Sequence, residues 1–348
     1  MQEGPKGGSG GVFVDERTDG PGVSKIDPGD PAAPMYRLLA EMRQPVALRD
    51  IMIQPVRTGY IGQDKEIPNL PRSAEELYPD VAVNEMHVPS PDGPVRCWTY
   101  ATPSPSRAPA RPIMLYLHGG GFTIGSALDT AYITSRIAAE TGTVVVSVNY
   151  RLAPEWPFPA GMDDVAAVFR WLRANGGEIG GDPARISVAG DSAGGNMAAA
   201  LPVKLRDEGD DPPVAAVLLC PITDFLFEEY DSFERLGPLG IVYDTAFIGY
   251  IRGAYAVLRK NWTHPHVSPA RADLGAFPPT LIASGTHDPL IDDNRSFAER
   301  LRTAGRDVEH FVREGMPHGY YFFDGLFKEG DEAFAAISAF LKRTAGHG

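Results

Sequence analysis

Hydrophobic and polar positions follow two alternating periods along most of this chain. Short, almost continuous apolar runs predict buried strands, at 112–117, 143–148, 186–189, 215–221 and 279–285. Segments with apolar residues at helical spacing separate or follow them, at 131–140, 162–175, 193–206, 293–304 and 331–342. A further strand is expected at 308–312. Strands that alternate with helices indicate an α/β protein, with a mostly parallel central sheet covered by helices on both faces.

Two local features add to this pattern. Residues 81–102 alternate apolar and polar positions around Ser90–Gly93, which predicts a β-hairpin ahead of the first buried strand. Pro202 falls inside the helix expected at 193–206. That helix should therefore kink at the proline or break near 197–201.

Two segments lie outside the alternation and suggest a cap. Residues 35–80 include helical patterns but are too short for a domain of their own. Residues 222–265 are rich in aromatic side chains, which are either more core or a cap that lines an apolar pocket. We favour the cap, because insertions after strands lie where such sheets bind ligands. The chain then divides into a flexible arm at 1–34, a two-part helical cap at 35–80 and 222–265, and one α/β domain at 81–221 and 266–348.

Composition and charge restrict the partners. The 348 residues suffice for one large α/β domain or two smaller ones. A formal net charge of -13 at pH 7 argues against nucleic acid or an anionic membrane, because both need a basic surface. The N-terminus has no apolar signal segment, and no apolar run reaches the roughly 18 residues of a membrane span. A cytoplasmic protein is therefore expected.

Cysteine and histidine usage suggests neither a cofactor nor a metal. Cys97 and Cys220 lie far apart in apolar, strand-like runs. Two reduced, buried thiols are therefore favoured over a disulfide or a pair of ligands. The 8 histidines leave room for one catalytic base and form no obvious metal cluster in the sequence.

The sequence Gly190-Asp191-Ser192-Ala193-Gly194 stands between a predicted strand and a predicted helix. Strand, G-x-S-x-G and helix together predict a nucleophile elbow, which exposes the serine hydroxyl on a tight, strained turn. The two glycines let strand and helix approach closely. The N–H of Ala193 would lie at a helix N-terminus, where negative charge is favoured. A chance turn is the alternative in a chain with 38 glycines.

A glycine-rich stretch, His118-Gly119-Gly120-Gly121-Phe122, follows the strand at 112–117. Glycines leave backbone N–H groups open to a ligand. Such donors suit an oxyanion hole, which stabilises charge that develops on a carbonyl oxygen. A phosphate loop is disfavoured because no Gly-Lys-Ser/Thr follows, and a plain glycine turn is the remaining alternative. His118 is expected to shape this loop through hydrogen bonds.

A serine nucleophile needs a histidine base and a carboxylate that orients it, in the chain order serine, acid, histidine. Asp288 directly follows the strand at 279–285 and is the expected acid. The competing carboxylates are Asp224, Asp292 and Asp293. His318 follows the next strand and is the expected base. The other histidines are expected to be packed or peripheral, namely His87, His264, His266, His287, His310 and His347.

Together these motifs resemble the hormone-sensitive-lipase-like carboxylesterases, the bacterial family IV esterases of the α/β-hydrolase fold. The matching segments run in family order from about residue 80 to the C-terminus, at 118–122, 150–155, 190–195, 268–269, 288–292 and 318–319. The resemblance implies Ser192 as the nucleophile, His318 as the base and Asp288 as the acid. It also implies that three backbone N–H groups form the oxyanion hole, those of Gly120, Gly121 and Ala193.

The expected function is hydrolysis of short- to medium-chain or aromatic carboxylic esters through an acyl-enzyme intermediate. Two alternatives stay open. One is an amidase or N-deacetylase with the same triad, and the other is a receptor on the same fold that binds a small molecule without hydrolysing it. The expected partner is a small-molecule ester, and the sequence leaves a homodimer open.

Overall fold

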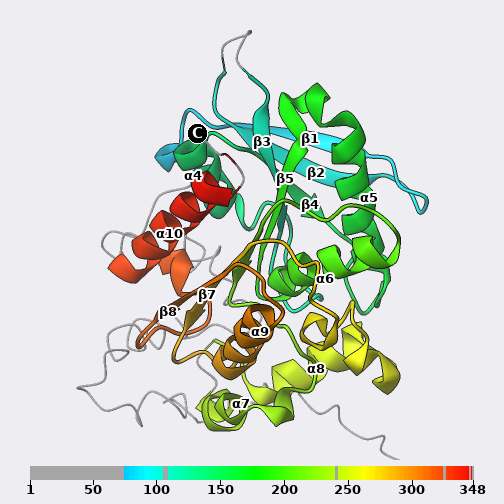
Figure 1. The fold of residues 1–348 in the computed structure, drawn as a ribbon, viewed down its shortest axis with the longest axis vertical. Helices are drawn as coiled ribbons and strands as arrows, with labels where there is room; N and C mark the ends of the chain where they lie inside the picture. The colour runs from blue at the N-terminus through cyan, green and yellow to red at the C-terminus, as the bar shows by residue number, and fades with distance from the viewer. Residues whose placement is uncertain (1–73, 105–108, 240–241, 324–326, 345, 347–348) are drawn as a thin grey trace, which may run out of the picture.

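A computed structural model of the chain describes residues 74–104, 109–239, 242–323, 327–344 and 346. Within these residues, strands and helices alternate along the chain (Figure 1). The strands are β1 (Ala82–Val88), β2 (Val95–Ala101), β3 (Arg111–Leu117), β4 (Val144–Asn149), β5 (Gly181–Asp191), β6 (Ala216–Leu219), β7 (Thr280–Gly285) and β8 (Val308–Arg313). The α-helices are α3 (Ala74–Leu77), α4 (Ala131–Thr141), α5 (Ala160–Asn175), α6 (Ala193–Asp207), α7 (Asp231–Leu236), α8 (Thr245–Tyr255), α9 (Ile291–Thr303) and α10 (Lys328–Thr344).

The strands form one sheet in the order β1-β2-β4-β3-β5-β6-β7-β8. β1 and β4 each pair antiparallel with β2, and all the other pairs are parallel. The inner strands β6 and β7 are buried along their whole length, whereas the edge strands β1 and β8 are mostly half-buried or exposed. Parallel strands covered on both faces have no polar face, which explains the continuous apolar runs of the sequence.

Helices cover both faces of the sheet (Figure 1). Alternate residues of β3 point into two separate cores, as expected of a strand. Ile113 and Leu115 pack in one core with α5, α6 and α9, whereas Met114 and Tyr116 pack in the other with α4 and α10. The expected mostly parallel sheet between two layers of helices is confirmed.

The break expected in the helix at 193–206 is wrong, and the alternative of a kink at Pro202 stays a prediction. α6 runs from Ala193 to Asp207 through Pro202, without the break expected near 197–201. Every residue of this helix from Ala193 to Leu205 is buried. Burial of so many side chains offsets the roughly 3 kcal/mol that a proline costs in a helix interior. Tertiary packing therefore overrides the local signal.

The N-terminal predictions are tested only in part. The hairpin expected at 81–102 is confirmed as β1 and β2, with the N–H of Gly93 donating to the carbonyl of Ser90. α3 is a short helix near the end of the segment 35–80, in which the sequence predicts helical patterns. The arm at 1–34 and most of the segment 35–80 lie outside the described residues.

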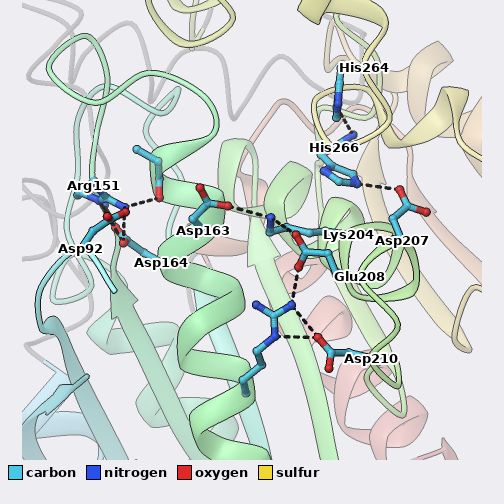
Figure 2. Close-up of polar contacts among 12 residues, drawn as sticks. Asp92, Arg151, Asp163, Asp164, Lys204, Asp207, Glu208, Asp210, His264 and His266 are labelled. Atoms are coloured by element: carbon cyan, nitrogen blue, oxygen red, sulfur yellow. Dashed lines mark hydrogen bonds and ion pairs between the residues drawn. The ribbon is translucent and has the colours of Figure 1, made fainter. Parts of the chain in front are cut away.

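Ion pairs connect α5 with α6 (Figure 2). The ammonium group of Lys204 lies 2.8 Å from a carboxylate oxygen of Asp163 and 2.7 Å from one of Glu208. Arg151, ahead of α5, donates to Asp164 through both its backbone N–H and its guanidinium group. These contacts fix the chain between β4 and α5 and give that segment a structural role.

The segment 222–265 leaves the sheet between β6 and β7 and contains α7 and α8. α8 packs onto the glycine-rich segment after β3, where a Cβ at Gly121 would lie 2.7 Å from Cγ2 of Ile251. α7 contacts the turn after β7, because Oγ of Ser232 donates to the carbonyl of Pro289 (2.8 Å). Both contacts lie just beyond the carboxyl ends of parallel strands, where sheets of this kind bind ligands.

Candidate active site

Ser192 occupies the turn between β5 and α6 in a strained backbone conformation. Its φ of 55° and ψ of -115° lie outside the regions that residues other than glycine normally adopt. Gly190 and Gly194 permit this turn, because a Cβ on either would overlap backbone atoms of a neighbouring segment. Ser192 is partly exposed, whereas Asp191 and Ala193 on either side are buried. These are the features of a nucleophile elbow.

Asp191 attaches the glycine-rich loop to this elbow. The N–H of Gly119 donates to Oδ1 of Asp191 (3.1 Å), and the hydroxyl of Tyr116 donates to the same oxygen (2.9 Å). Burial raises the pKa of Asp191 to about 6, and the two donors oppose that shift. These hydrogen bonds therefore attach the loop after β3 to the residue that directly precedes Ser192.

Three backbone N–H groups are candidates for the oxyanion hole. Gly120 and Gly121 have φ values of 114° and 59°, which favour glycine. The N–H groups of Thr123 and Ile124 donate to the carbonyl of Gly120 and close a tight turn. Ala193 is the first residue of α6, so its N–H is outside the helix's own hydrogen-bond ladder. Negative charge is favoured at that position.

His118 shapes the loop from within, as the sequence predicts. Its Nδ1 lies 2.7 Å from the carbonyl oxygen of Gly119, and its ring stacks on Tyr150 with 4.3 Å between centroids. The Tyr150 hydroxyl donates to the carbonyl of His118 (2.6 Å). Burial lowers the pKa of His118 to about 4, so its imidazole is neutral at pH 7.

Asp288 and His318, the expected acid and base, are buried and in contact with each other. Oδ2 of Asp288 lies 2.7 Å from Nδ1 of His318. The aspartate is 0% exposed and the histidine 7%. A carboxylate at Nδ1 holds the ring proton there and leaves Nε2 as the proton acceptor.

Backbone contacts between two loops bring this pair together. The N–H of His287 donates to the carbonyl of Met316 (3.0 Å). Gly285 allows this approach, because a Cβ there would overlap the same carbonyl. Asp288 follows β7 and His318 follows β8, so contact between the loops brings these two side chains together.

The elbow is connected to the pair through the end of β6. The N–H of Ser192 donates to the carbonyl of Leu219 (2.8 Å). The next residue is Cys220, and its sulfur, the Asp288 carboxylate and the His318 imidazole lie within 4.8 Å of one another. The three predicted catalytic residues are thus brought to one carboxyl edge, at the ends of β5, β7 and β8.

The competing carboxylates have different partners. Asp224 pairs with Arg271 at 2.8 Å. Asp292 and Asp293 lie in the first turn of α9, where negative charge is favoured. Asp293 is buried and accepts a hydrogen bond from the backbone N–H of Thr223 (2.7 Å).

The competing histidines also lie in other surroundings. His310 is in β8, with its Nε2 3.1 Å from Oγ of Ser284. His266 lies 2.9 Å from Asp207, and the rings of His264 and His266 meet edge to face (Figure 2). The side chains of His87 and His287 lie near Glu85 (3.6 Å) and Thr286 (3.3 Å) respectively. His347 lies outside the described residues.

Sequence reasoning missed two neighbours of the acid. The hydroxyl of Tyr243 donates to Oδ1 of Asp288 (2.9 Å) from the segment between α7 and α8. In the sequence it is one aromatic among many in that segment, so no local signal distinguishes it. Cys220 is free and buried as predicted, but its φ of 45° and its position beside the acid had no sequence signal.

Comparisons with known proteins show which fold and which enzymes this chain is similar to. The family model for the alpha/beta hydrolase fold matches residues 114–322. Carboxylesterase NlhH of Mycobacterium tuberculosis is 37% identical over 279 residues, which cover 78% of this chain and 86% of that protein. Esterase LipI of the same organism is 34% identical over 83% of this chain and 91% of its own. The structure of a hyperthermophilic esterase from Pyrobaculum calidifontis aligns with a TM-score of 0.78 and 28% identity, over 90% of this chain and 98% of that one.

The fold and the site together define an α/β hydrolase. Within that fold, the chain belongs to the hormone-sensitive-lipase-like carboxylesterases, bacterial family IV. It is a carboxylic ester hydrolase, and the amidase and receptor alternatives are not favoured by these relatives. In the described part of the chain, no helix has both the length and the apolar character needed to cross a membrane.

Proposed function

We propose that Ser192 is the nucleophile of this carboxylesterase, with His318 as its base and Asp288 as the orienting acid. The observation that carries the proposal is the buried 2.7 Å contact between Asp288 Oδ2 and His318 Nδ1. The strained backbone of Ser192 supports it further. The oxyanion hole consists of three backbone N–H groups, those of Gly120, Gly121 and Ala193.

In this reaction Nε2 of His318 accepts the hydroxyl proton of Ser192 while Oγ attacks the ester carbonyl. The oxyanion of the tetrahedral intermediate accepts hydrogen bonds from the three N–H groups. His318 then gives its proton to the leaving alcohol oxygen, and the acyl group stays on Oγ. Water, deprotonated by the same imidazole, attacks the acyl-enzyme. The products are a carboxylic acid and the free serine.

We propose that the segments 35–80 and 222–265 form a cap over the α/β domain, with residues 1–34 as an arm. The support comes from α8, where Cζ of Phe247 would lie 3.1 Å from a Cβ at Gly121. An aromatic side chain beside the oxyanion loop suits short- to medium-chain or aromatic esters.

A cytoplasmic location is also part of the proposal. Two free, buried thiols suit a reducing compartment, because structural disulfides are rare there. Cell fractionation tests the location. The homodimer that the sequence leaves open is decided by light scattering of the purified protein.

The experiment compares wild type with Ser192→Ala on p-nitrophenyl esters from acetate to laurate. We expect kcat to fall by at least about 10⁴-fold in the variant, because the covalent step is lost while the fold is kept. Ser187→Ala is a matched control, because Ser187 lies in the same strand and donates to the carbonyl of Ile113 (3.2 Å). The control should keep wild-type turnover.

Two outcomes contradict these proposals separately. Turnover by Ser192→Ala within about tenfold of wild type would refute the triad. Wild-type rates that rise steadily towards laurate would refute the preference for shorter chains and leave the triad intact.

A further inference from the structure

The carboxylate of Asp288 is held from two sides. One oxygen, Oδ2, faces the imidazole of His318 at 2.7 Å. The other, Oδ1, accepts hydrogen bonds from the backbone N–H of Leu290 (2.9 Å) and from the hydroxyl of Tyr243 (2.9 Å). The Leu290 donor is local, two residues further along the chain. Tyr243 lies 45 residues before the acid, outside the α/β domain proposed above.

Tyr243 also contacts the base. Its ring meets the ring of His318 almost at a right angle, with 4.9 Å between centroids and 86° between planes. This edge arrangement is a favourable one for two aromatic rings. One side chain therefore contacts both members of the acid–base pair, through its hydroxyl on Asp288 and through its ring on His318.

The hydroxyl of Tyr243 is a permanent donor. Burial, with the nearby charge of Asp288 as a smaller cause, raises the pKa of Tyr243 well above its usual range. The phenol therefore keeps its proton throughout the working pH range of an esterase. A donor fixed on Oδ1 makes a hydrogen bond to the carboxylate and holds its plane so that Oδ2 faces Nδ1 of His318.

The segment that carries Tyr243 is attached to the acid's loop at two further points. Thr223 donates through its backbone N–H to Asp293 (2.7 Å). Ser232 donates through its hydroxyl to the carbonyl of Pro289 (2.8 Å). These contacts attach Thr223 and Ser232, which precede Tyr243 in the inserted segment, to the residues that follow β7 and carry the proposed acid.

We propose that Tyr243 is a positioning residue of the catalytic triad, which the segment between α7 and α8 supplies to the acid. The inference rests on the proposed function, since it requires Asp288 and His318 to act as acid and base. It assigns the inserted segment a second role besides covering the substrate. One hydrogen bond, from Tyr243 to Asp288, then couples the position of the inserted segment to the activity of the triad.

The test is Tyr243→Phe, which keeps the ring against His318 and removes only the hydroxyl. We expect kcat for p-nitrophenyl acetate to fall about tenfold with KM nearly unchanged, because a hydrogen bond to a charged group is lost. The acidic limb of the kcat/KM profile should move to higher pH by roughly half a unit, since a carboxylate with one donor fewer favours the protonated imidazole.

Tyr230→Phe is the matched control. Its hydroxyl donates to Oδ2 of Asp224 (3.1 Å) in the same inserted segment, so the same kind of bond is removed at a carboxylate outside the triad. The control should keep the wild-type kcat and the wild-type acidic limb. The position of the limb does not depend on how much protein folds, so a reduced yield of either variant leaves the test decisive.

Two results would overturn the inference. One is wild-type kcat and pH profile in Tyr243→Phe. The other is an equal loss of kcat in both tyrosine variants with the limb unmoved, which would make the hydroxyl a structural contact only. Activity retained in Ser192→Ala would instead refute the proposed triad itself. Failure of the inference about Tyr243 and failure of the proposed function are therefore distinguishable.

Discussion

The two halves of the site are held in different ways. On the elbow side, backbone atoms of β3, β5 and α6 approach closely at glycines, and a Cβ at Gly194 would overlap the carbonyl of Leu117. On the acid side, three hydroxyl groups of the inserted segment donate hydrogen bonds to residues 288–293, the acid loop: those of Thr223, Ser232 and Tyr243. The elbow therefore depends on the absence of side chains, and the acid loop depends on their presence.

This difference has an energetic consequence. A backbone clash cannot be relieved by rotating a side chain, so a single methyl group at the elbow should displace a strand or a helix. A hydrogen bond from a side chain contributes only about 1 kcal/mol, so the acid loop should tolerate the loss of one contact. The predictions below test this contrast in order of decreasing effect.

Gly194→Ala should have the largest effect. The added Cβ would overlap the carbonyl oxygens of Leu117 and His118, and we expect a loss of more than about 3 kcal/mol in the free energy of unfolding, measured in urea. Gly249→Ala in α8 is the control, because its Cβ would meet no atom within 4 Å. That control should gain up to about 1 kcal/mol from helix propensity. A small loss in Gly194→Ala would mean that the elbow can shift.

The same contrast explains what the sequence could predict. Glycine is needed at positions 190 and 194 because backbone segments approach closely there. This requirement produces a short motif around Ser192 that can be recognised in the sequence. Asp288 and His318 follow predicted strands, so chain order and the sheet edge identify them. This is why the sheet and the elbow could be predicted from the sequence, and why Asp288 and His318 could be expected at one edge of the sheet.

The remainder of the site could not be predicted for physical reasons. Tyr243 reaches Asp288 across 45 residues, and nothing in the neighbouring sequence records that contact. Cys220 was predictable as a buried thiol but not as a neighbour of the acid. The helix break expected near Pro202 does not occur, because burial of the surrounding helix outweighs the local propensity of proline.

The free energy of unfolding should depend on pH because of Asp293, which lies in the acid loop. Burial raises the pKa of this carboxyl to about 8, although the N–H and hydroxyl of Thr223 both donate to it. In the unfolded chain its pKa is about 3.9. Above that pH the unfolded state loses its proton while the folded state keeps it, so stability falls as pH rises towards 8.

Asp293→Asn should therefore be more stable than wild type at pH 8, on the order of 3 kcal/mol, and nearly equal to it at pH 4. The amide can donate to the Thr223 hydroxyl and accept from its N–H, so both contacts survive. Urea unfolding at a series of pH values measures the slope. Asp292→Asn, one residue earlier, should keep the wild-type slope. Some pH dependence should remain in Asp293→Asn because of Asp191, whose pKa is raised to about 6. The assignment to Asp293 is wrong if the slopes of Asp293→Asn and wild type coincide.

Ser232→Ala should have the smallest effect and is the sharpest test of the contrast. The buried hydroxyl donates to the carbonyl of Pro289 and accepts from the N–H of Asp292 (3.2 Å), so its removal should cost about 1 to 2 kcal/mol of unfolding free energy. Ser338→Ala removes an exposed contact to Glu140 (2.9 Å) and should cost less than about 0.5 kcal/mol. The acidic limb of the pH profile should stay at its wild-type position in both, because the Tyr243 hydroxyl remains on Asp288. If Ser232→Ala costs no more than the exposed control, backbone contacts alone hold the acid loop, and the two halves of the site are built alike.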